Sequence, residues 1–181
     1  MSKTVSDELD GIYKIVNEWL KFAEQKNAAL LVLNSGSVWG VSLMLRNQDT
    51  LSCGGVTFSA LGFALIFISS LICVFSFIPT LYKPSYSPNL GKKSNFDNCV
   101  YFGDIAKYEE SDYLALLNYK LGEEVEHSYS LFERDFASQI ITNARITLAK
   151  YKKFKLSSIL TVIGFVLFGL TALTLYAGKI F

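Results

Sequence analysis

Three long apolar stretches interrupt a chain whose charged residues are otherwise evenly spread. No Asp, Glu, Lys or Arg occurs in 27–45, 50–82 or 156–178. The apolar cores inside these gaps are 28–45, 56–78 and 156–178, which as helices rise about 27, 35 and 35 Å. The hydrocarbon core of a bilayer is about 30 Å thick. The pattern therefore predicts three transmembrane helices.

Amphipathic segments precede the first and third of these spans. Apolar residues recur there at steps of three and four, the spacing of one helix face. No proline lies between either segment and its span, so each pair is predicted to form one continuous helix, the second of about fifty residues. We expect the two stripes to pack together as a helical stalk. The stripes include Leu9, Ile12, Val16 and Trp19, and Val125, Tyr129, Phe132, Phe136, Ile140 and Tyr151.

Helix-breaking residues gather after the second span. Pro79, Pro84 and Pro88 fall within ten residues of one another. Because proline removes a backbone donor and blocks a helix interior, we expect the second span to end near Ile78 and 82–100 to be a loop.

A short helix is predicted farther on, over Ser111–Leu121. Ser111 or Asp112 would cap its start, and Gly122 would close it. The sequence thus predicts an all-α integral membrane protein. Three transmembrane helices, two of them extended into a cytoplasmic helical stalk, are joined by a short helix and a proline-rich loop.

The basic residues predict the orientation of the spans. Residues 1–27 hold four Lys or Arg and residues 79–155 hold eleven, whereas 46–55 and 179–181 hold one each. Basic residues favour the cytoplasmic side. We therefore expect a cytoplasmic amphipathic helix over 1–27, a cytoplasmic loop and helical region over 79–155, and a periplasmic loop and tail.

Candidate chemistry is sparse. The 17 basic and 16 acidic residues nearly cancel, which excludes the strong positive footprint of a dedicated nucleic-acid binder. Cys53, Cys73 and Cys99 lie in three different settings and indicate neither a disulfide framework nor a metal site. His127 occupies a polar helix position and is interpreted as solvated or as part of an interface. We expect no catalytic residue, metal or cofactor, and hence no enzyme.

The first span carries the most specific membrane feature. Asn34 near mid-membrane requires a partner, so it should face another helix or water rather than lipid. Gly36 and Gly40 form a small-xxx-small pattern, which lets two helix backbones approach closely. The pattern leaves packing within one subunit, a subunit interface and a pore lining open. Candidate partners of Asn34 are Ser69, Ser70, Thr161, Thr171 and Thr174.

Three stretches resemble the signatures of a known family. They are Glu24-Gln-Lys-Asn-Ala-Ala-Leu-Leu-Val-Leu-Asn34, Tyr101-Phe-Gly-Asp-Ile-Ala106 and Gln139-Ile-Ile-Thr-Asn-Ala-Arg-Ile-Thr-Leu-Ala-Lys-Tyr151. Their order and their relation to the spans resemble the Pycsar-type transmembrane effectors, to which small effectors associated with retrons are related. The resemblance covers most of the chain.

The resemblance implies an anti-phage effector in the bacterial inner membrane. Once triggered, such a protein permeabilises or depolarises the membrane and causes abortive infection. The implied partners are the lipid bilayer, further copies of the chain on activation, and either a cyclic pyrimidine nucleotide or a reverse transcriptase with its RNA–DNA product. We expect the partner or signal to act at Phe102, Gly103, Asp104, Lys150 and Tyr151. A purely structural role, in which Phe102 plugs the stalk and Asp104 caps a local turn, stays open.

Two other function classes stay open. One is a non-defence scaffold or regulatory subunit that docks a cytoplasmic partner through the two long helices. The other is a transporter or channel component, which three spans without an intramembrane ionisable residue make less favourable.

Overall fold

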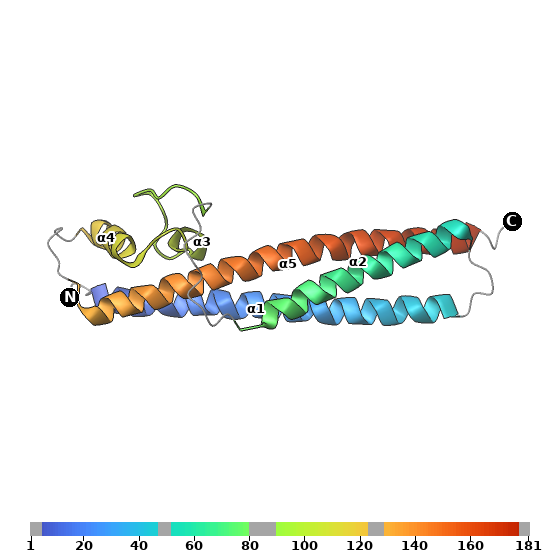
Figure 1. Ribbon diagram of the computed structural model, residues 1–181, viewed down its shortest axis with the longest axis horizontal. Helices are drawn as coiled ribbons and strands as arrows, with labels where there is room; N and C mark the ends of the chain where they lie inside the picture. Colours follow the sequence, from blue (N-terminus) through green and yellow to red (C-terminus); the bar gives the residue numbers. More distant parts are fainter. Residues whose placement is uncertain (1–4, 47–51, 80–89, 123–128, 178–181) are drawn as a thin grey trace. The chain divides into compact units, whose positions relative to one another are not determined.

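The computed structural model shows an all-α chain. Within the described residues, which are 5–46, 52–79, 90–122 and 129–177, no strand is present. The helices are α1 (Val5–Arg46), α2 (Cys53–Phe77), α3 (Phe102–Ile105), α4 (Glu110–Leu121) and α5 (Leu131–Ala177) (Figure 1).

Three of these helices, α1, α2 and α5, are long and apolar enough to cross a membrane. The predicted all-α fold with three apolar helices is thereby confirmed. α2 ends at Phe77, and Ile78 is extended, as expected from the prolines that follow. α1 continues without a break from its amphipathic segment into its apolar one, and Gly11 lies inside it.

α5 also joins its amphipathic and apolar segments in one helix of 47 residues. It begins at Leu131, later than predicted, so Tyr129 precedes it. Other predictions fall outside the described residues, namely those on Val125, His127, Pro84 and Pro88.

The chain divides into two compact units. Unit 1 consists of Met1–Ala23 and Pro79–Tyr151, and unit 2 consists of Glu24–Ile78 and Lys152–Phe181. Unit 2 therefore holds the three predicted spans, and unit 1 holds most of the polar sequence.

Unit 1 is built on the apolar stripes of α1 and α5. Leu9 and Val16 of α1 and Ile140 and Ala144 of α5 are fully buried in one core, which α3 and α4 complete. The predicted packing of the two stripes is confirmed for these residues. Phe132 departs from it, because 65% of its surface is exposed and its ring stacks on Phe136 instead of entering the core.

α4 begins one residue earlier than the sequence predicted. Its N-cap is Glu109, without a side-chain hydrogen bond to the backbone, so neither Ser111 nor Asp112 caps it. Asp112 is paired with Lys93 instead. The predicted end is confirmed, since Gly122 closes the helix at a φ of 71°, which favours glycine.

Unit 2 contains the apolar parts of α1, α2 and α5 (Figure 1). Small and polar residues make the contacts between these helices. The buried face of α2 repeats every three or four residues. A bilayer offers no hydrophobic drive for helices to associate, so close van der Waals contact and hydrogen bonds must hold them. The buried residues of α2 are Gly55, Ser59, Gly62, Ile66, Ser69, Cys73 and Ser76.

Candidate functional site

A hydrogen-bonded network ties the three membrane helices together around Asn34. Its Nδ2 donates to Ser69 Oγ of α2 at 3.0 Å, and its Oδ1 accepts from Thr161 Oγ1 of α5 at 2.9 Å. Ser69 Oγ also donates to the backbone oxygen of Ser157 at 2.9 Å. Asn34, Ser69 and Thr161 are almost wholly buried. We call these four residues the Asn34 network.

Hydroxyl protons are scarce in the Asn34 network. Ser69 Oγ and Thr161 Oγ1 also lie 2.9 Å apart, and either can donate to the other. Each hydroxyl has only one proton, and these two protons serve three short contacts. The network can therefore exchange hydrogen bonds without separating the helices. Asn34 faces two helices, as the cost of an unpartnered amide in a membrane requires.

The two glycines of the first span do not pack against any of the other described helices. A Cβ built at Gly36 or at Gly40 would meet no atom within 4 Å. Described residues of α1 beyond Asn34 are exposed or only partly buried. Within the part of the chain that the structure describes, this small-xxx-small pattern therefore makes no close helix contact.

A different pair of glycines makes the close approach, where α2 crosses α5. A Cβ at Gly62 would lie 2.6 Å from Phe168 Cε1 and 3.3 Å from the backbone oxygen of Gly164. A Cβ at Gly164 would lie 2.9 Å from Ile66. Sequence reasoning missed this pair. The available signal was the three-residue or four-residue spacing of Ser59, Gly62, Ile66 and Ser69, which places small residues on one face.

In unit 1, Phe102 is the centre of an aromatic cluster. Its ring stacks on Tyr151 at a centroid distance of 5.2 Å and meets Trp19 at 5.7 Å. Only 6% of its surface is exposed. Two of the residues predicted to receive a signal, Phe102 and Tyr151, are thus in direct contact. Burial, and then the charge of Tyr101, raise the pKa of Tyr151.

Gly103 leaves room for a neighbouring side chain and does not form a left-handed turn. Positive φ values in the described chain occur at Gly91 and Gly122, so Gly103 does not use the left-handed region. A Cβ at Gly103 would lie 2.5 Å from the Tyr101 ring. Gly103 therefore makes room for Tyr101, whose ring packs beside Phe102.

Asp104 belongs to a local charge network. Its carboxylate accepts from Lys107 Nζ at 2.6 Å and from the backbone N–H of Asn98 at 3.0 Å. Lys107 also binds Asp97, which accepts from the Tyr108 hydroxyl at 2.8 Å. These bonds fix the turn before α3. Lys150, the remaining predicted input residue, is 9% exposed and also lies in unit 1.

The pKa values in this network shift in opposite directions. Burial alone would raise the pKa of Asp97, but hydrogen bonds from Tyr108 and Lys107 outweigh burial and lower it. The hydrogen bond to Asp104 raises the pKa of Lys107. Burial, together with the bond to Asp97, raises the pKa of Tyr108 to about 12. Lys107 therefore pairs with two carboxylates at once, those of Asp97 and Asp104.

Arg145 fastens residues 90–122 to α5, and sequence reasoning missed it. Its guanidinium donates to the backbone oxygens of Ala106 and Tyr108 at 3.1 and 2.8 Å and pairs with Glu109 at 2.9 Å. Only 10% of the Arg145 side chain is exposed. The Arg145 side chain thus supplies hydrogen-bond donors to two backbone carbonyl groups that follow α3.

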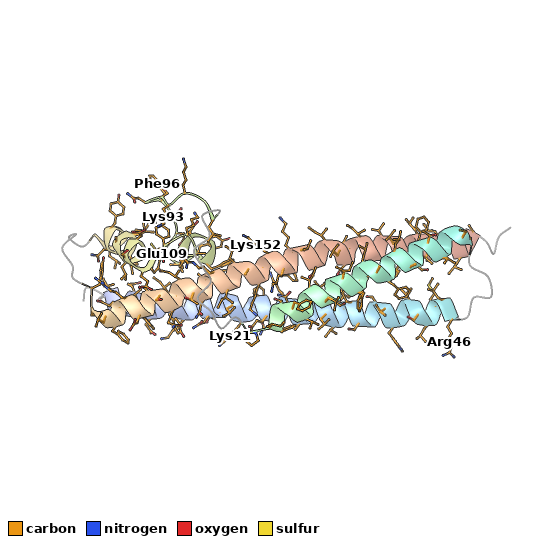
Figure 2. The ribbon with its side chains drawn as sticks, in the orientation of Figure 1. Lys21, Arg46, Lys93, Phe96, Glu109 and Lys152 are labelled. Carbon is orange, nitrogen blue, oxygen red and sulfur yellow. The ribbon has the colours of Figure 1, made fainter. Side chains whose placement is uncertain are left out.

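No metal-binding cluster is evident in the described residues. They contain no group of three or more His, Cys, Asp or Glu that could hold a metal ion. A cavity of about 360 Å³ opens beside the start of α4 (Glu109 is labelled in Figure 2). Two carboxylates against one guanidinium make it unfavourable for a phosphate. Its lining is Glu109, Glu110, Ser111, Tyr129 and Arg134.

Known proteins match the chain over most of its length. Residues 8–177 match the Pycsar effector protein domain, PycTM. The Pycsar effector protein RsPycTM of a Rhizobium species is 26% identical over 146 residues, which cover 80% of this chain and 81% of that protein. No solved structure matches the chain.

Proposed function

Because the chain belongs to the PycTM family of Pycsar effector proteins, we propose that it is an anti-phage defence effector of the bacterial inner membrane. On infection it permeabilises or depolarises that membrane, so that the infected cell stops growing before phage are released. The N-terminus lies in the cytoplasm and the C-terminus in the periplasm, as the basic residues favour.

The observation that carries this proposal is the Asn34 network. It joins three apolar helices through neutral groups. Interhelical hydrogen bonds in membranes contribute only about 0.6 to 2 kcal/mol each. Such a network holds one packing of the helices at rest and yields to another when a signal favours the second state. A protein that only anchors a partner to the membrane would not need the Asn34 network.

The trigger we propose is a cyclic pyrimidine nucleotide. The matching domain and RsPycTM are both described as Pycsar effectors, which supports this trigger over a retron partner. Release from a reverse transcriptase with its RNA–DNA product is the second candidate. The signal enters unit 1 through Phe102, whose ring links Trp19 of α1 to Tyr151 of α5.

Activation also involves further copies of the chain. Gly36 and Gly40 have open space around them, whereas Gly62 and Gly164 are closely packed. The open pair supports contact between first spans of neighbouring subunits, where absent side chains allow close approach.

The proposal is tested by membrane potential in growing bacteria. Cells that carry the chain are supplied with a cyclic pyrimidine nucleotide from a co-expressed cyclase, and a voltage-sensitive dye is followed. A cyclase variant without activity is the control. We expect loss of potential and growth arrest only with the active cyclase, and the same loss on phage infection.

The contrary outcomes lead to specific alternatives. If depolarisation occurs only after a co-purifying reverse transcriptase is removed, the chain is held inactive by that partner, as in the retron case. Full potential under both triggers and under phage challenge rejects the effector proposal. Capture of a cytoplasmic partner in that last case favours the scaffold or regulatory subunit.

Asp104→Asn tests whether the signal is received at the turn before α3. A signalling role predicts normal expression and folding with lost response to the trigger. A purely structural role predicts lower stability, because the ion pair with Lys107 is lost. Unchanged stability, partner capture and phage protection would remove this turn from the input site.

A further inference from the structure

The cytoplasmic end of unit 2, as the basic residues orient it, carries an excess of positive charge. Lys26, Lys152, Lys153 and Lys155 lie there, at the ends of the apolar spans. Among the described residues of unit 2, Glu24 is the only acidic side chain. A local excess of this kind attracts an anionic partner.

The structure separates these lysines by what they contact. Lys153 Nζ donates to the backbone oxygen of Phe75 at 3.2 Å and so caps the end of α2. Lys26 Nζ lies 5.6 Å from the centre of the Phe154 ring. Lys152 and Lys155 are exposed, and Lys152 projects from α5 (Figure 2). These two lysines are therefore available to a partner.

An exposed apolar stripe on α5 begins directly after Lys152 and Lys155. The positions that continue from them along α5 recur every three or four residues, and their side chains are exposed. On a helix of about 3.6 residues per turn they fall on the side opposite Ser157, Thr161 and Gly164, which pack against other helices. The stripe consists of Leu156, Ile159, Val162, Ile163 and Val166.

The length of this stripe matches one leaflet of a bilayer. From Leu156 to Val166 the helix rises about 15 Å. The hydrocarbon core is about 30 Å thick, so half of it is about 15 Å. A molecule with a negative head and apolar chains of that length fits both parts of the surface, whereas a free anion fits only the lysines.

We propose that Lys152 and Lys155, with the apolar stripe below them, form a binding site for an anionic phospholipid of the cytoplasmic leaflet. The phosphate accepts from the two ammonium groups, and the acyl chains lie along Leu156, Ile159 and Ile163. The inference rests on the membrane placement of α5 and not on the defence role.

Lipid selectivity of the purified full-length protein tests the site. The protein in neutral detergent is titrated with dioleoyl phosphatidylglycerol or dioleoyl phosphatidylcholine, and bound lipid is counted by native mass spectrometry. We expect selective retention of phosphatidylglycerol. Lys152→Gln with Lys155→Gln should weaken that binding about 30-fold, the equivalent of about 2 kcal/mol for two lysines near a membrane surface.

Three controls isolate the cause. Lys21→Gln with Lys92→Gln removes the same charge from exposed lysines of unit 1 and should bind like the wild type. Lys152→Arg with Lys155→Arg keeps the charge and should retain selectivity, which assigns the effect to positive charge at these two positions. Rising salt should weaken binding by the wild type more than binding by the double glutamine variant.

Specific results would overturn the proposal. One is equal retention of the two lipids by the wild type. Another is undiminished phosphatidylglycerol binding after Lys152→Gln with Lys155→Gln. Displacement of the lipid by inorganic phosphate alone would reduce the site to a simple anion site. Because no trigger is added, each of these results would leave the proposed defence function standing.

Discussion

At the scale of single residues, Asn34 is the polar group on which both neighbouring spans converge. Its amide donates a hydrogen bond to one helix and accepts one from the other. A side chain that can only donate, or only accept, therefore cannot replace it. A leucine of similar volume would suit lipid better but could restrain neither Ser69 nor Thr161. The amide therefore contributes specificity of packing more than insertion.

Asn34→Leu should release the resting packing without impairing insertion. Two interhelical hydrogen bonds are lost, each of about 0.6 to 2 kcal/mol, so the resting state should lose about tenfold or more in relative population. Membrane potential without any trigger measures the effect. Ser35→Ala is the matched control, because that hydroxyl bonds only to the carbonyl of Leu31 in its own helix. Equal potential in both variants would mean that the network does not hold the resting state.

Tyr108 should make unit 1 sensitive to alkali. Its pKa is raised from 10.0 to about 12 in the folded chain, so the unfolded chain loses the proton first. Stability contributed by this hydroxyl is complete below pH 10 and is lost as pH rises toward about 12. The pKa of Lys107 is also raised, so its contribution to stability is likewise lost as pH rises. Near-ultraviolet circular dichroism during an alkaline titration follows the loss.

Tyr108→Phe supplies the comparison for that titration. The variant lacks the titrating hydroxyl, so its alkaline loss of stability should be smaller, although its stability at neutral pH is lower. Identical alkaline profiles for the variant and the wild type would contradict the assignment. On the acid side, Asp97 has a lowered pKa, so its contribution is present above 3.8 and is lost as pH falls below it.

At the scale of elements, the crossing of α2 and α5 depends on Gly62. A methyl group there meets the Phe168 ring and the backbone oxygen of Gly164. Gly62→Ala should therefore push the helices apart and destabilise the protein by about 1 to 3 kcal/mol, the usual effect of overpacking. Thermal unfolding in detergent measures this change.

Gly36→Ala provides the contrast on α1. Its methyl group meets no described atom outside its own helical turn, so monomer stability should not fall. Gly36→Leu and Gly40→Leu should alter triggered depolarisation only through contacts between subunits. Equal thermal shifts for Gly62→Ala and Gly36→Ala would contradict the described crossing.

The elements themselves could be predicted because charge-free runs and helical periodicity are local properties. Continuous helices through α1 and α5 followed from the absence of proline, and the partners of Asn34 came from a short set of hydroxyl residues. The Gly62 crossing was not predicted, because a sequence does not state which side of a span faces its neighbour. Arg145 was missed for a related reason, since its acceptors lie more than 35 residues away in the chain.

At the scale of the whole molecule, topology is the main expectation to be measured. Cys53 is exposed at the start of α2, but Cys99 is buried and burial raises its thiol pKa. Cys99 would therefore label poorly on either side of the membrane. Phe96→Cys is a better cytoplasmic probe, because 96% of the Phe96 surface is exposed.

A membrane-impermeant thiol reagent on spheroplasts should label Cys53 and spare Phe96→Cys until the membrane is opened. This result follows from basic residues on the cytoplasmic side. Labelling of Phe96→Cys in intact spheroplasts, with Cys53 protected, would reverse the orientation. Labelling of both residues would require a different number of crossings.

The position of Arg145 sets an order of events during synthesis of the chain. Residues 90–122 leave the ribosome before it, and at about 5 to 20 residues per second the 23 positions from 122 to 145 take about 1 to 5 s. Until then the carbonyls of Ala106 and Tyr108 lack the guanidinium that binds them. The third span begins eleven residues after Arg145, so Arg145 can bind the segment only shortly before the last crossing is made. A nascent chain that stalls early would therefore carry two spans and an unfastened segment.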